Sequence, residues 1–457
     1  MVCRLPVGKL VDILASKTVG IPEKILEKSF IGITTDTRHL EPDQVFLALR
    51  GEKFDGHDYA ALAVEKGALA VICEATNLTQ LEGLPLIQVE NTLKAYQQIA
   101  RWWRDQFQIP VIAVTGSVGK TTTKELIAAV LSTKGTVLKT QANYNNEIGV
   151  PKTLLELGPD HDYAVIEMAM RGSGQIAELT DIANPTVGVI TNVGTAHIGL
   201  LGSTEAIAKA KCELLAHMSN NGVAVLNHDN QRLIDTAAQV WQGQTITYGL
   251  EGGDVPGELI APEIVKVEGM EFPIPLPGRH NALNYLGALA IGKLLGVDWE
   301  TLSNGLKVEL PAGRAQRYEL PNDVVILDET YNAGVESMVA ALEMLAQTPG
   351  KRHIAVLGAM KELGTKSGEL HQQVGQKVEQ LNLDGLRILV DESEPEAEAI
   401  ATGITSVPVE CFCDSNPLVE HLLGFVQPGD RLLFKASHSV GLDQVVKQFK
   451  AGFSKQD

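Results

Sequence analysis

Short apolar runs alternate along the chain with longer segments in which apolar residues recur at helical spacing. In the first hundred residues the short runs predict strands at 30–34, 45–49, 70–73 and 86–89. Helical patterns separate these strands, and the last of them is an aromatic-rich helix around Trp102 and Trp103. This part of the chain therefore predicts a small α/β unit.

The same alternation continues through the rest of the chain. Apolar runs at 111–114, 164–166, 186–190 and 223–226 predict a mainly parallel sheet, because helical patterns lie between them. The Pro- and Gly-rich stretch 255–278 predicts antiparallel hairpins, and a helix follows over 281–295. Beyond a linker near 310–314, runs at 324–327, 354–357, 387–390 and 432–434 predict a third, Rossmann-like unit. This unit has no G-x-G-x-x-G motif, so dinucleotide binding is not indicated.

The length of the chain agrees with several domains. A chain of 457 residues exceeds what one hydrophobic core usually organises, so about three domains are expected. We place them at 1–108, 109–312 and 313–457. The predicted fold class is α/β: a small α/β domain, a central domain with a mainly parallel sheet, and a C-terminal Rossmann-like domain.

Composition narrows the classes of partner. The formal net charge of −18 and the pI near 5.1 argue against a broad nucleic-acid surface and favour a small metabolite. The five cysteines form neither a disulfide framework nor a zinc-binding spacing, which is typical of a reducing cytoplasm. The N-terminal segment is interrupted by Arg4, Lys9 and Asp12, and no apolar run reaches the roughly 18 residues of a membrane span. We expect a cytoplasmic protein with no membrane or nucleic-acid partner.

The most informative motif follows the apolar run at 111–114. Gly116 and Gly119 allow backbone N–H groups to approach phosphate oxygens, Lys120 supplies a cation, and Thr121 supplies a hydroxyl that Mg²⁺ can bind. The motif departs from G-x-x-x-x-G-K-[ST], because Val114 stands where the first glycine is expected. An ordinary strand-to-helix turn is the alternative. The amphipathic helix that follows favours a nucleotide site that uses ATP or GTP.

Two polar residues lie at or just beyond the carboxyl ends of neighbouring predicted strands. Glu167 ends the run at 164–166, and His197 lies just past the run at 186–190. Open parallel sheets bind ligands at this edge, so both side chains are candidate Mg²⁺ ligands beside Lys120 and Thr121. Taken singly, Glu167 could equally be a surface acid, and a lone histidine is more often structural.

A predicted helix over 203–218 carries two lysines on different faces. Helical geometry places Lys211 on the apolar face and Lys209 nearly opposite, where it is solvated. A lysine on an apolar face either extends its amine to water or has a role for a desolvated amine. From the pattern alone, an amine that extends to water is favoured.

Further along the chain, paired polar residues suggest nucleotide contacts. Asn281 and Asn284 stand three residues apart on the helix after Gly278, where both amides can face one planar ligand. The alternative is a helix cap followed by an exposed asparagine. Arg314 and Asp328 flank the start of the third unit and could hold a nucleotide from the far side of a cleft.

Together these motifs resemble the Mur ligase family. The resemblance covers nearly the whole chain and is carried by Asp36-Thr-Arg38, Val45-Phe-Leu-Ala-Leu-Arg-Gly51, Phe54-Asp-Gly-His-Asp58, the loop 115–125, Asn145-Asn-Glu-Ile-Gly-Val-Pro151, Ile166-Glu-Met168, Thr191-Asn-Val-Gly-Thr-Ala-His197, Asp328-Glu-Thr-Tyr-Asn332 and Glu362-Leu-Gly364. The first three motifs resemble the UDP-binding domain of the third and fourth ligases of that pathway.

The resemblance implies an ATP-driven amide ligation. The chain looks most like the members that add D-alanyl-D-alanine to UDP-N-acetylmuramoyl-tripeptide in peptidoglycan precursor synthesis. In these members the substrate carboxylate attacks the γ-phosphate of ATP, which gives an acyl phosphate and ADP, and the amine of the dipeptide then displaces phosphate. ATP and Mg²⁺ are the implied cofactors, and no covalent intermediate on the protein is needed. We expect a monomer.

The resemblance also implies roles for individual residues, which replace the interpretation of Lys211 as an amine that extends to water. Catalytic roles fall on Lys120, Lys211 and His197. Metal ligation falls on Thr121, Glu167, His197 and Lys211, the last as a carbamylated lysine. ATP contacts fall on Thr115, Gly116, Ser117, Val118, Gly119, Lys120, Thr121, Thr122, Asn281, Asn284, Arg314 and Asp328. Contacts to the UDP substrate fall on Asp36, Thr37, Arg38, Asn145 and Asn146.

Three motifs of the third unit depart from the family pattern. The usual Tyr-Asn-Ala-Asn-Pro is Tyr331-Asn-Ala-Gly-Val335, Leu-Gly-Asp-Met is Leu357-Gly-Ala-Met360, and Lys-Gly-Ser is Lys435-Ala-Ser437. The diamino-acid-adding ligase of the same pathway is a competing assignment, but its Asp-Asn-Pro-Arg is matched only by Asp414-Ser-Asn-Pro-Leu418, without the arginine. A nucleotide-sugar-binding protein that has lost ligation also competes. A generic P-loop ATPase would leave the 36–38 motif unexplained.

Overall fold

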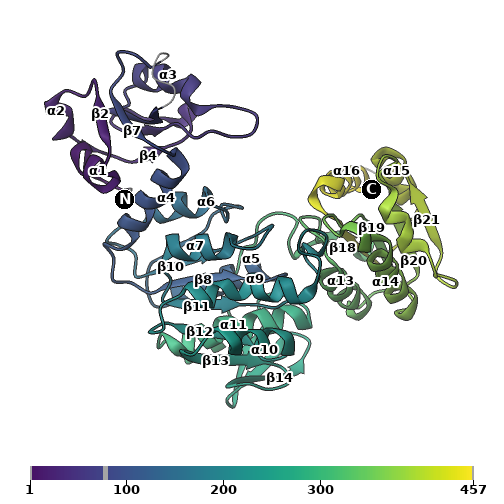
Figure 1. Ribbon diagram of the computed structural model, residues 1–457. Helices are drawn as coiled ribbons and strands as arrows, with labels where there is room; N and C mark the ends of the chain where they lie inside the picture. Colours follow the sequence, from purple (N-terminus) through teal and green to yellow (C-terminus); the bar gives the residue numbers. More distant parts are fainter. Residues whose placement is uncertain (1–2, 76–80, 455–457) are drawn as a thin grey trace.

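Three lobes make up the molecule (Figure 1). The computed structural model describes residues 3–75 and 81–454. Each lobe contains its own sheet of mostly parallel strands with helices packed against it, and the central lobe contacts both of the others. The predicted α/β class and its three-part organisation are confirmed, whereas the boundaries at 108 and 312 stay a prediction.

The first lobe has a five-stranded sheet in the order β2-β7-β6-β5-β4, with β2 antiparallel to its neighbour. Its elements are α1 (Val7–Leu14), β2 (Lys17–Val19), α2 (Glu23–Leu26), β4 (Ile33–Thr34), β5 (Val45–Leu47), α3 (Ala60–Glu65), β6 (Ala70–Glu74), β7 (Leu86–Val89) and α4 (Thr92–Arg104). The single strand predicted over 30–34 is wrong. Gly32, with φ of 147°, separates β4 from β3 (Ser29–Phe30), which pairs instead with β1 (Leu5–Pro6).

The central lobe has a nine-stranded sheet in the order β16-β15-β14-β13-β12-β11-β8-β10-β9. Its strands are β8 (Val111–Thr115), β9 (Val137–Lys139), β10 (Tyr163–Glu167), β11 (Val187–Ile190), β12 (Val223–Asn227), β13 (Gln244–Gly249), β14 (Val255–Ala261), β15 (Ile264–Val267) and β16 (Met270–Pro273). Strands β9 to β14 are parallel where they pair with one another and with β8, and β14, β15 and β16 form the predicted antiparallel hairpins.

Strand β8 is buried on both faces, which explains its unbroken apolar sequence. Val111 and Ala113 join the core that includes residues of α7 (Gln175–Ala183) and α9 (Thr204–His217), while Ile112 and Val114 join the core that includes residues of α5 (Lys120–Ser132) and α11 (Arg279–Leu294). Strand β8 pairs with β10 on one side and with β11 on the other, so the chain first builds the sheet on one side of β8 and then crosses to build it on the other side. Such a switch point is the usual ligand position in open α/β sheets.

The remaining helices of this lobe complete its outer layers. They are α6 (Gly149–Leu154), α8 (Ile198–Leu201), α10 (Gln231–Val240) and α12 (Trp299–Ser303). The helix predicted over 281–295 is α11, which begins two residues earlier than expected. The helix predicted over 203–218 is α9, with Ser203 as its N-cap.

The third lobe has a six-stranded sheet in the order β17-β18-β22-β19-β20-β21, with β17 antiparallel to β18. Its elements are β17 (Gln316–Leu320), β18 (Val324–Asp328), α13 (Val335–Gln347), β19 (Arg352–Gly358), α14 (Ser367–Gln380), β20 (Gly385–Leu389), β21 (Val409–Phe412), α15 (Ser415–Phe425), β22 (Asp430–Lys435) and α16 (Leu442–Phe453). Across the parts of the chain that the structure describes, no helix combines the length and apolar character needed to span a membrane.

Candidate active site

The loop between β8 and α5 has a shape that only glycine permits at two positions. Gly116 and Gly119 have φ of 147° and 81°. A Cβ atom would lie 2.0 Å from Thr191 Oγ1 at Gly116, and 2.6 Å from Asn284 Oδ1 at Gly119. The backbone can therefore wrap closely around a small anion at the N-terminus of α5, where helix N–H groups favour negative charge.

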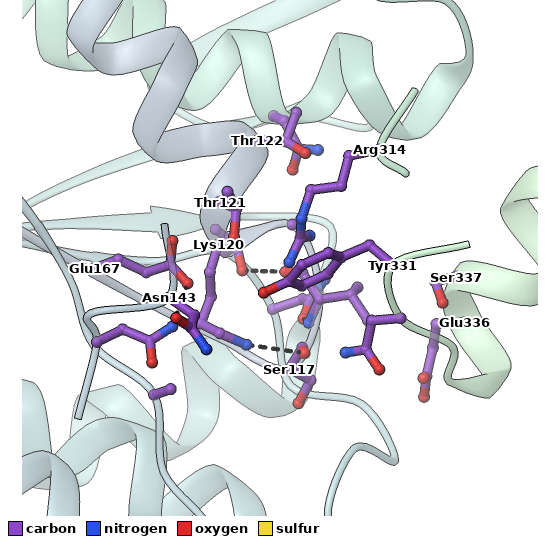
Figure 2. Close-up of a pocket in the computed structure, with 18 of the residues that line it drawn as sticks. Ser117, Lys120, Thr121, Thr122, Asn143, Glu167, Arg314, Tyr331, Glu336 and Ser337 are labelled. Atoms are coloured by element: carbon purple, nitrogen blue, oxygen red, sulfur yellow. Dashed lines mark hydrogen bonds between the residues drawn. The ribbon is translucent and has the colours of Figure 1, made fainter. Parts of the chain in front are cut away.

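Lys120 is the first residue of α5, and its side chain turns back along this loop. Its amine donates to Gly116 O at 2.9 Å. It also donates to Ser117 O at 3.3 Å (Figure 2). Desolvation lowers the pKa of Lys120, while the nearby Glu167 carboxylate opposes that shift. A cation held by backbone carbonyls at the mouth of the loop can move onto a phosphate without a large rearrangement.

A cavity of about 710 Å³ opens over this loop between the central and third lobes. In Figure 2, Lys120, Glu167 and Asn143 lie on one side, and Arg314, Tyr331 and Glu336 lie on the other. The cavity brings together most of the site residues predicted from the sequence, which are Ser117, Val118, Gly119, Lys120, Thr121, Thr122, Asn145, Asn146, Glu167, His197, Asn281, Asn284 and Arg314. Its size suits a nucleotide-sized ligand.

Several other predicted residues do not line this cavity. The Thr115 hydroxyl donates to Met168 O at 2.9 Å, and Gly116, at the start of the loop, packs against Thr191. Asp328 accepts the Thr330 hydroxyl at 2.6 Å and is buried. The ATP contacts assigned to these three positions stay predictions.

The 36–38 motif lies in the first lobe and also outside the cavity. Asp36 caps a short 3₁₀ turn by accepting the Arg38 N–H, and its carboxylate pairs with the Arg38 guanidinium at 2.7 Å. This pairing lowers the pKa of Asp36 to about 2. Thr37, which lies between them in the sequence, is buried. The UDP contacts assigned to this turn stay predictions.

Glu167 is the last residue of β10, and only one of its carboxylate oxygens has a hydrogen-bond partner in the described part of the chain. Its Oε1 accepts from Asn145 Nδ2 at 2.8 Å, and its backbone N–H donates to Thr140 Oγ1 at 2.9 Å. Its Oε2 is buried and has no hydrogen-bond partner among the described residues. Buried polar atoms are rarely left unpaired, so Oε2 is suited to a cation supplied with the ligand.

The Lys211 amine is a second buried group without a hydrogen-bond partner in the part of the chain that the structure describes. Its side chain is fully buried on the apolar face of α9, as the pattern predicts, whereas Lys209 is exposed. The interpretation that the Lys211 amine extends to water is wrong, because Nζ is buried and lacks a partner in the described structure. Desolvation and the charge of Lys120 lower the pKa of Lys211 well below its usual value. A neutral amine is the form that reacts with CO₂ to give a carbamate.

His197 lies between the central and third lobes. Its backbone is left-handed, with φ of 65°, and its Nδ1 lies 2.5 Å from Glu362 Oε2. Desolvation and then the charge of Lys211 lower the pKa of His197, which favours the neutral imidazole that binds metals. Within the described residues, no three His, Cys, Asp or Glu side chains form a group that could hold a metal ion by themselves. Any cation here needs ligand oxygens as well.

Arg314 reaches the cavity from the connection between the central and third lobes. Its guanidinium stacks on the Tyr331 ring at 4.0 Å from the centroid, and that ring stacks in turn on His438 at 5.7 Å. This stack gives the third lobe a flat cationic surface that faces the phosphate loop.

Three family models match consecutive parts of the chain. The Mur ligase family catalytic domain matches residues 29–104, the Mur ligase middle domain matches 114–292, and the Mur ligase glutamate ligase domain matches 313–438. The chain belongs to the Mur ligase family. This Mur ligase is 60% identical over 419 residues to the UDP-N-acetylmuramoyl-tripeptide–D-alanyl-D-alanine ligase of Synechocystis sp., with 92% of each chain covered. It is 35% identical to the corresponding ligase of Escherichia coli, over 96% of this chain and 97% of that one.

Solved structures agree with this assignment. MurF from Acinetobacter baumannii superimposes with a TM-score of 0.89 and 30% identity, over 98% of this Mur ligase and 99% of that chain. MurF from Thermotoga maritima, solved in complex with ADP, superimposes with a TM-score of 0.82 and 32% identity, over 93% and 98% of the two chains. The three-domain α/β architecture is that of the family.

Sequence reasoning missed several charged residues of the cavity in this Mur ligase, among them Glu336, Lys435 and Glu329. Lys435, the last residue of β22, donates to Asn332 O at 2.8 Å and lies 3.9 Å from Glu329 Oε2. Burial lowers the pKa of Lys435 and raises that of Glu329. Each residue follows or ends a predicted strand, as Glu167 does in the central lobe, but only the order of strands in the sheet brings the two together.

Glu167 belongs to a network of buried charged side chains. The Lys124 amine, fully buried on α5, donates to Thr140 O at 2.7 Å and lies 3.0 Å from Glu125 Oε1 and 3.9 Å from Glu167 Oε2. Lys139, which is partly exposed, pairs with the other oxygen of Glu125. Lys124 therefore separates two buried carboxylates.

We expect Lys124→Met to lower the free energy of unfolding by about 3 kcal/mol, because it leaves buried carboxylates without their shared cation. Urea unfolding followed by circular dichroism measures the change. Lys139→Met is the control, since it removes a cation from the same Glu125 at a half-buried position. Equal midpoints for the two variants would contradict this account of the network.

Proposed function

We propose that this Mur ligase uses ATP and Mg²⁺ to join D-alanyl-D-alanine to UDP-N-acetylmuramoyl-tripeptide in peptidoglycan precursor synthesis, in the cytoplasm. The observation that carries the proposal is the cavity in which Lys120, Glu167 and His197 of the central lobe face Arg314 of the third. The relatives that match over nearly the whole chain bear the name of this ligase.

The cavity suits phosphoryl transfer from ATP to a carboxylate. Backbone N–H groups at 119–121 and the Lys120 cation would hold the β- and γ-phosphates, while Arg314 approaches from the other lobe. Asn281 and Asn284 line the same cavity from the first turns of α11 and would contact the nucleoside. These groups orient the transferred phosphoryl group and offset its charge, so the attacking carboxylate needs no activation by a base.

Two buried atoms without a hydrogen-bond partner among the described residues, Glu167 Oε2 and Lys211 Nζ, suit a site for a divalent cation. Thr121, Glu167 Oε2, His197 and a carbamylated Lys211 would hold Mg²⁺ together with phosphate oxygens. Bound Mg²⁺ would neutralise negative charge that builds up on the phosphate oxygens. The Lys211 amine is buried and its pKa is lowered, which favours the neutral form that carbamylation requires, and the carbamate oxygens would carry a negative charge that a cation can share.

Amide formation then needs the dipeptide amine to reach the acyl phosphate from the side of the third lobe. Glu336, Ser337 and Asn332 line that side of the cavity. The departures from the family pattern at Gly334 and Val335 fall between Asn332 and Glu336, which line this wall, so we expect them to affect the amine substrate more than ATP.

The proposal is tested by Mg²⁺-dependent phosphate release from ATP with UDP-N-acetylmuramoyl-tripeptide. The amine is D-alanyl-D-alanine, diaminopimelate, lysine or none, and parallel reactions use the UDP-dipeptide. We expect release only with tripeptide and D-alanyl-D-alanine. Release with UDP-dipeptide and a diamino acid would identify the diamino-acid-adding ligase instead. Tight binding of the UDP substrate with no release in any pairing would indicate a protein that has lost ligation.

One structural observation disfavours the diamino-acid-adding ligase. Asp414, in the string nearest to that ligase's Asp-Asn-Pro-Arg, is the N-cap of α15 and accepts the Asn416 N–H at 3.0 Å. Because its carboxylate is used to cap a helix and no arginine follows Pro417, the string is explained by local structure.

A further inference from the structure

The backbone of the segment 194–199, which contains His197, is hydrogen-bonded to the third lobe at two points, in addition to the contact between the His197 and Glu362 side chains. The Glu336 carboxylate accepts the Thr195 N–H at 2.7 Å and the Thr195 hydroxyl at 3.1 Å. Four residues later, the Gly199 N–H donates to Glu362 O at 3.1 Å. His197 lies between these two contacts, so the third lobe fixes the backbone on both sides of it.

Both ends of this segment approach the third lobe very closely. A Cβ atom at Gly194 would lie 2.5 Å from Glu336 Oε1, and one at Gly199 would lie 2.5 Å from Gly364 N. The first contact would meet the end of a side chain, whereas the second would meet backbone. Larger residues would therefore push the segment away from the third lobe.

Glu336 is well placed to hold this segment. It is the second residue of α13, where a carboxylate is favoured by the helix N-terminus, and it is only partly buried. A carboxylate that accepts a backbone N–H makes a stronger hydrogen bond than a neutral acceptor does. The contact crosses 141 positions of sequence, so it forms only when the central and third lobes meet.

We propose that Glu336 is a positioning residue for ligation: its hold on Thr195 makes the placement of His197 depend on contact between the two lobes. The inference rests on the proposed function, in which His197 serves the reaction. Separation of the lobes releases the 194–199 segment, and the site is then incomplete even with ATP bound to the phosphate loop. Glu336 acts through Thr195, which occupies both of its carboxylate oxygens.

Hydrogen–deuterium exchange on the full chain tests the hold directly. We expect Glu336→Ala to speed exchange of the 194–199 amides roughly 10- to 100-fold, the factor that corresponds to losing a hydrogen bond to a charged acceptor. Alanine is a good helix former, so α13 is retained. Glu336→Gln keeps an acceptor for the Thr195 N–H and is expected to preserve most of the protection. Glu420→Ala, at an exposed position on α15, is the control and leaves this exchange unchanged.

A second variant attacks the other end of the segment. Gly199→Ala places a methyl group against the backbone of Gly364, so we expect the same faster exchange while Glu336 is intact. Unchanged exchange in both Glu336→Ala and Gly199→Ala would overturn the proposal, because the segment would then not be held by the third lobe.

Kinetics separate a positioning role from a structural one. We expect Glu336→Ala to lower kcat at least 10-fold with little change in KM for the UDP substrate, and Glu336→Gln to restore most of kcat. Faster exchange with an unchanged kcat would overturn the positioning role. If the wild-type chain forms no amide at all, the proposed function fails, while the exchange experiment still decides whether Glu336 holds the segment.

Discussion

Methionine in place of Lys211 is expected to lower ligation more than about 100-fold while leaving the protein equally stable or more stable. Removing an outer-shell partner of a metal ligand typically costs 10- to 100-fold, and Lys211 as a carbamate would be a ligand itself. Stability moves the other way, because a buried amine without a partner is unfavourable and methionine has nearly the same shape. Phosphate release and thermal unfolding measure the two effects on one sample.

Lys209→Met is the matched control, because Lys209 lies two residues earlier on the exposed side of the same helix. We expect it to retain full activity. A Lys211→Met protein that unfolds at a much lower temperature would show that the lysine is structural, and the carbamate hypothesis would be abandoned. Activity close to that of the wild type would have the same consequence.

Methionine in place of Lys120 is expected to lower kcat about 1000-fold, the upper range for removing one group that stabilises charge in a transition state. The lysine amine is the only side-chain cation placed directly on the phosphate loop among the residues described, and it lines the cavity. Binding of the UDP substrate is expected to persist, because the 36–38 motif assigned to it lies in the first lobe, outside the cavity that Lys120 lines. Phosphate release at saturating ATP and Mg²⁺ gives kcat, and calorimetry gives the affinity for the UDP substrate.

Lys134→Met serves as the control for this experiment. Lys134 follows the end of α5 and donates to Leu295 O at 2.7 Å, far along the helix from the loop. It is expected to change kcat less than twofold. If Lys120→Met hydrolyses ATP at the wild-type rate with both substrates present, the phosphate-loop assignment is wrong.

Local pattern predicted the elements that depend on neighbouring residues. The phosphate loop follows from a buried strand and two glycines, and the position of Lys211 on the apolar face follows from helical spacing, whereas the burial of its amine does not. The break at Gly32 was missed, because a single glycine in a short apolar run gives little warning of a change of sheet.

Contacts between lobes could not be predicted from local sequence patterns. Glu336 and Thr195 carry no shared periodicity, and only the packing of the third lobe on the central one brings them together. The pairing of Lys435 with Glu329 depends on the order of strands in the third sheet, which spacing does not specify. Asp328 flanks the start of the third unit, which suggested a nucleotide contact; its Oδ1 accepts the Thr330 hydroxyl, and the contact stays a prediction.

The two-sided cavity has a consequence for inhibitors. A compound that touches both Lys120 and Arg314 binds only the arrangement in which the lobes are close, so its apparent affinity is reduced by the fraction of molecules that are open. A compound confined to the phosphate loop avoids that reduction in affinity, but it also binds other proteins that carry such a loop. Selective compounds should therefore span the gap, and their affinity will rise with any change that holds the lobes together.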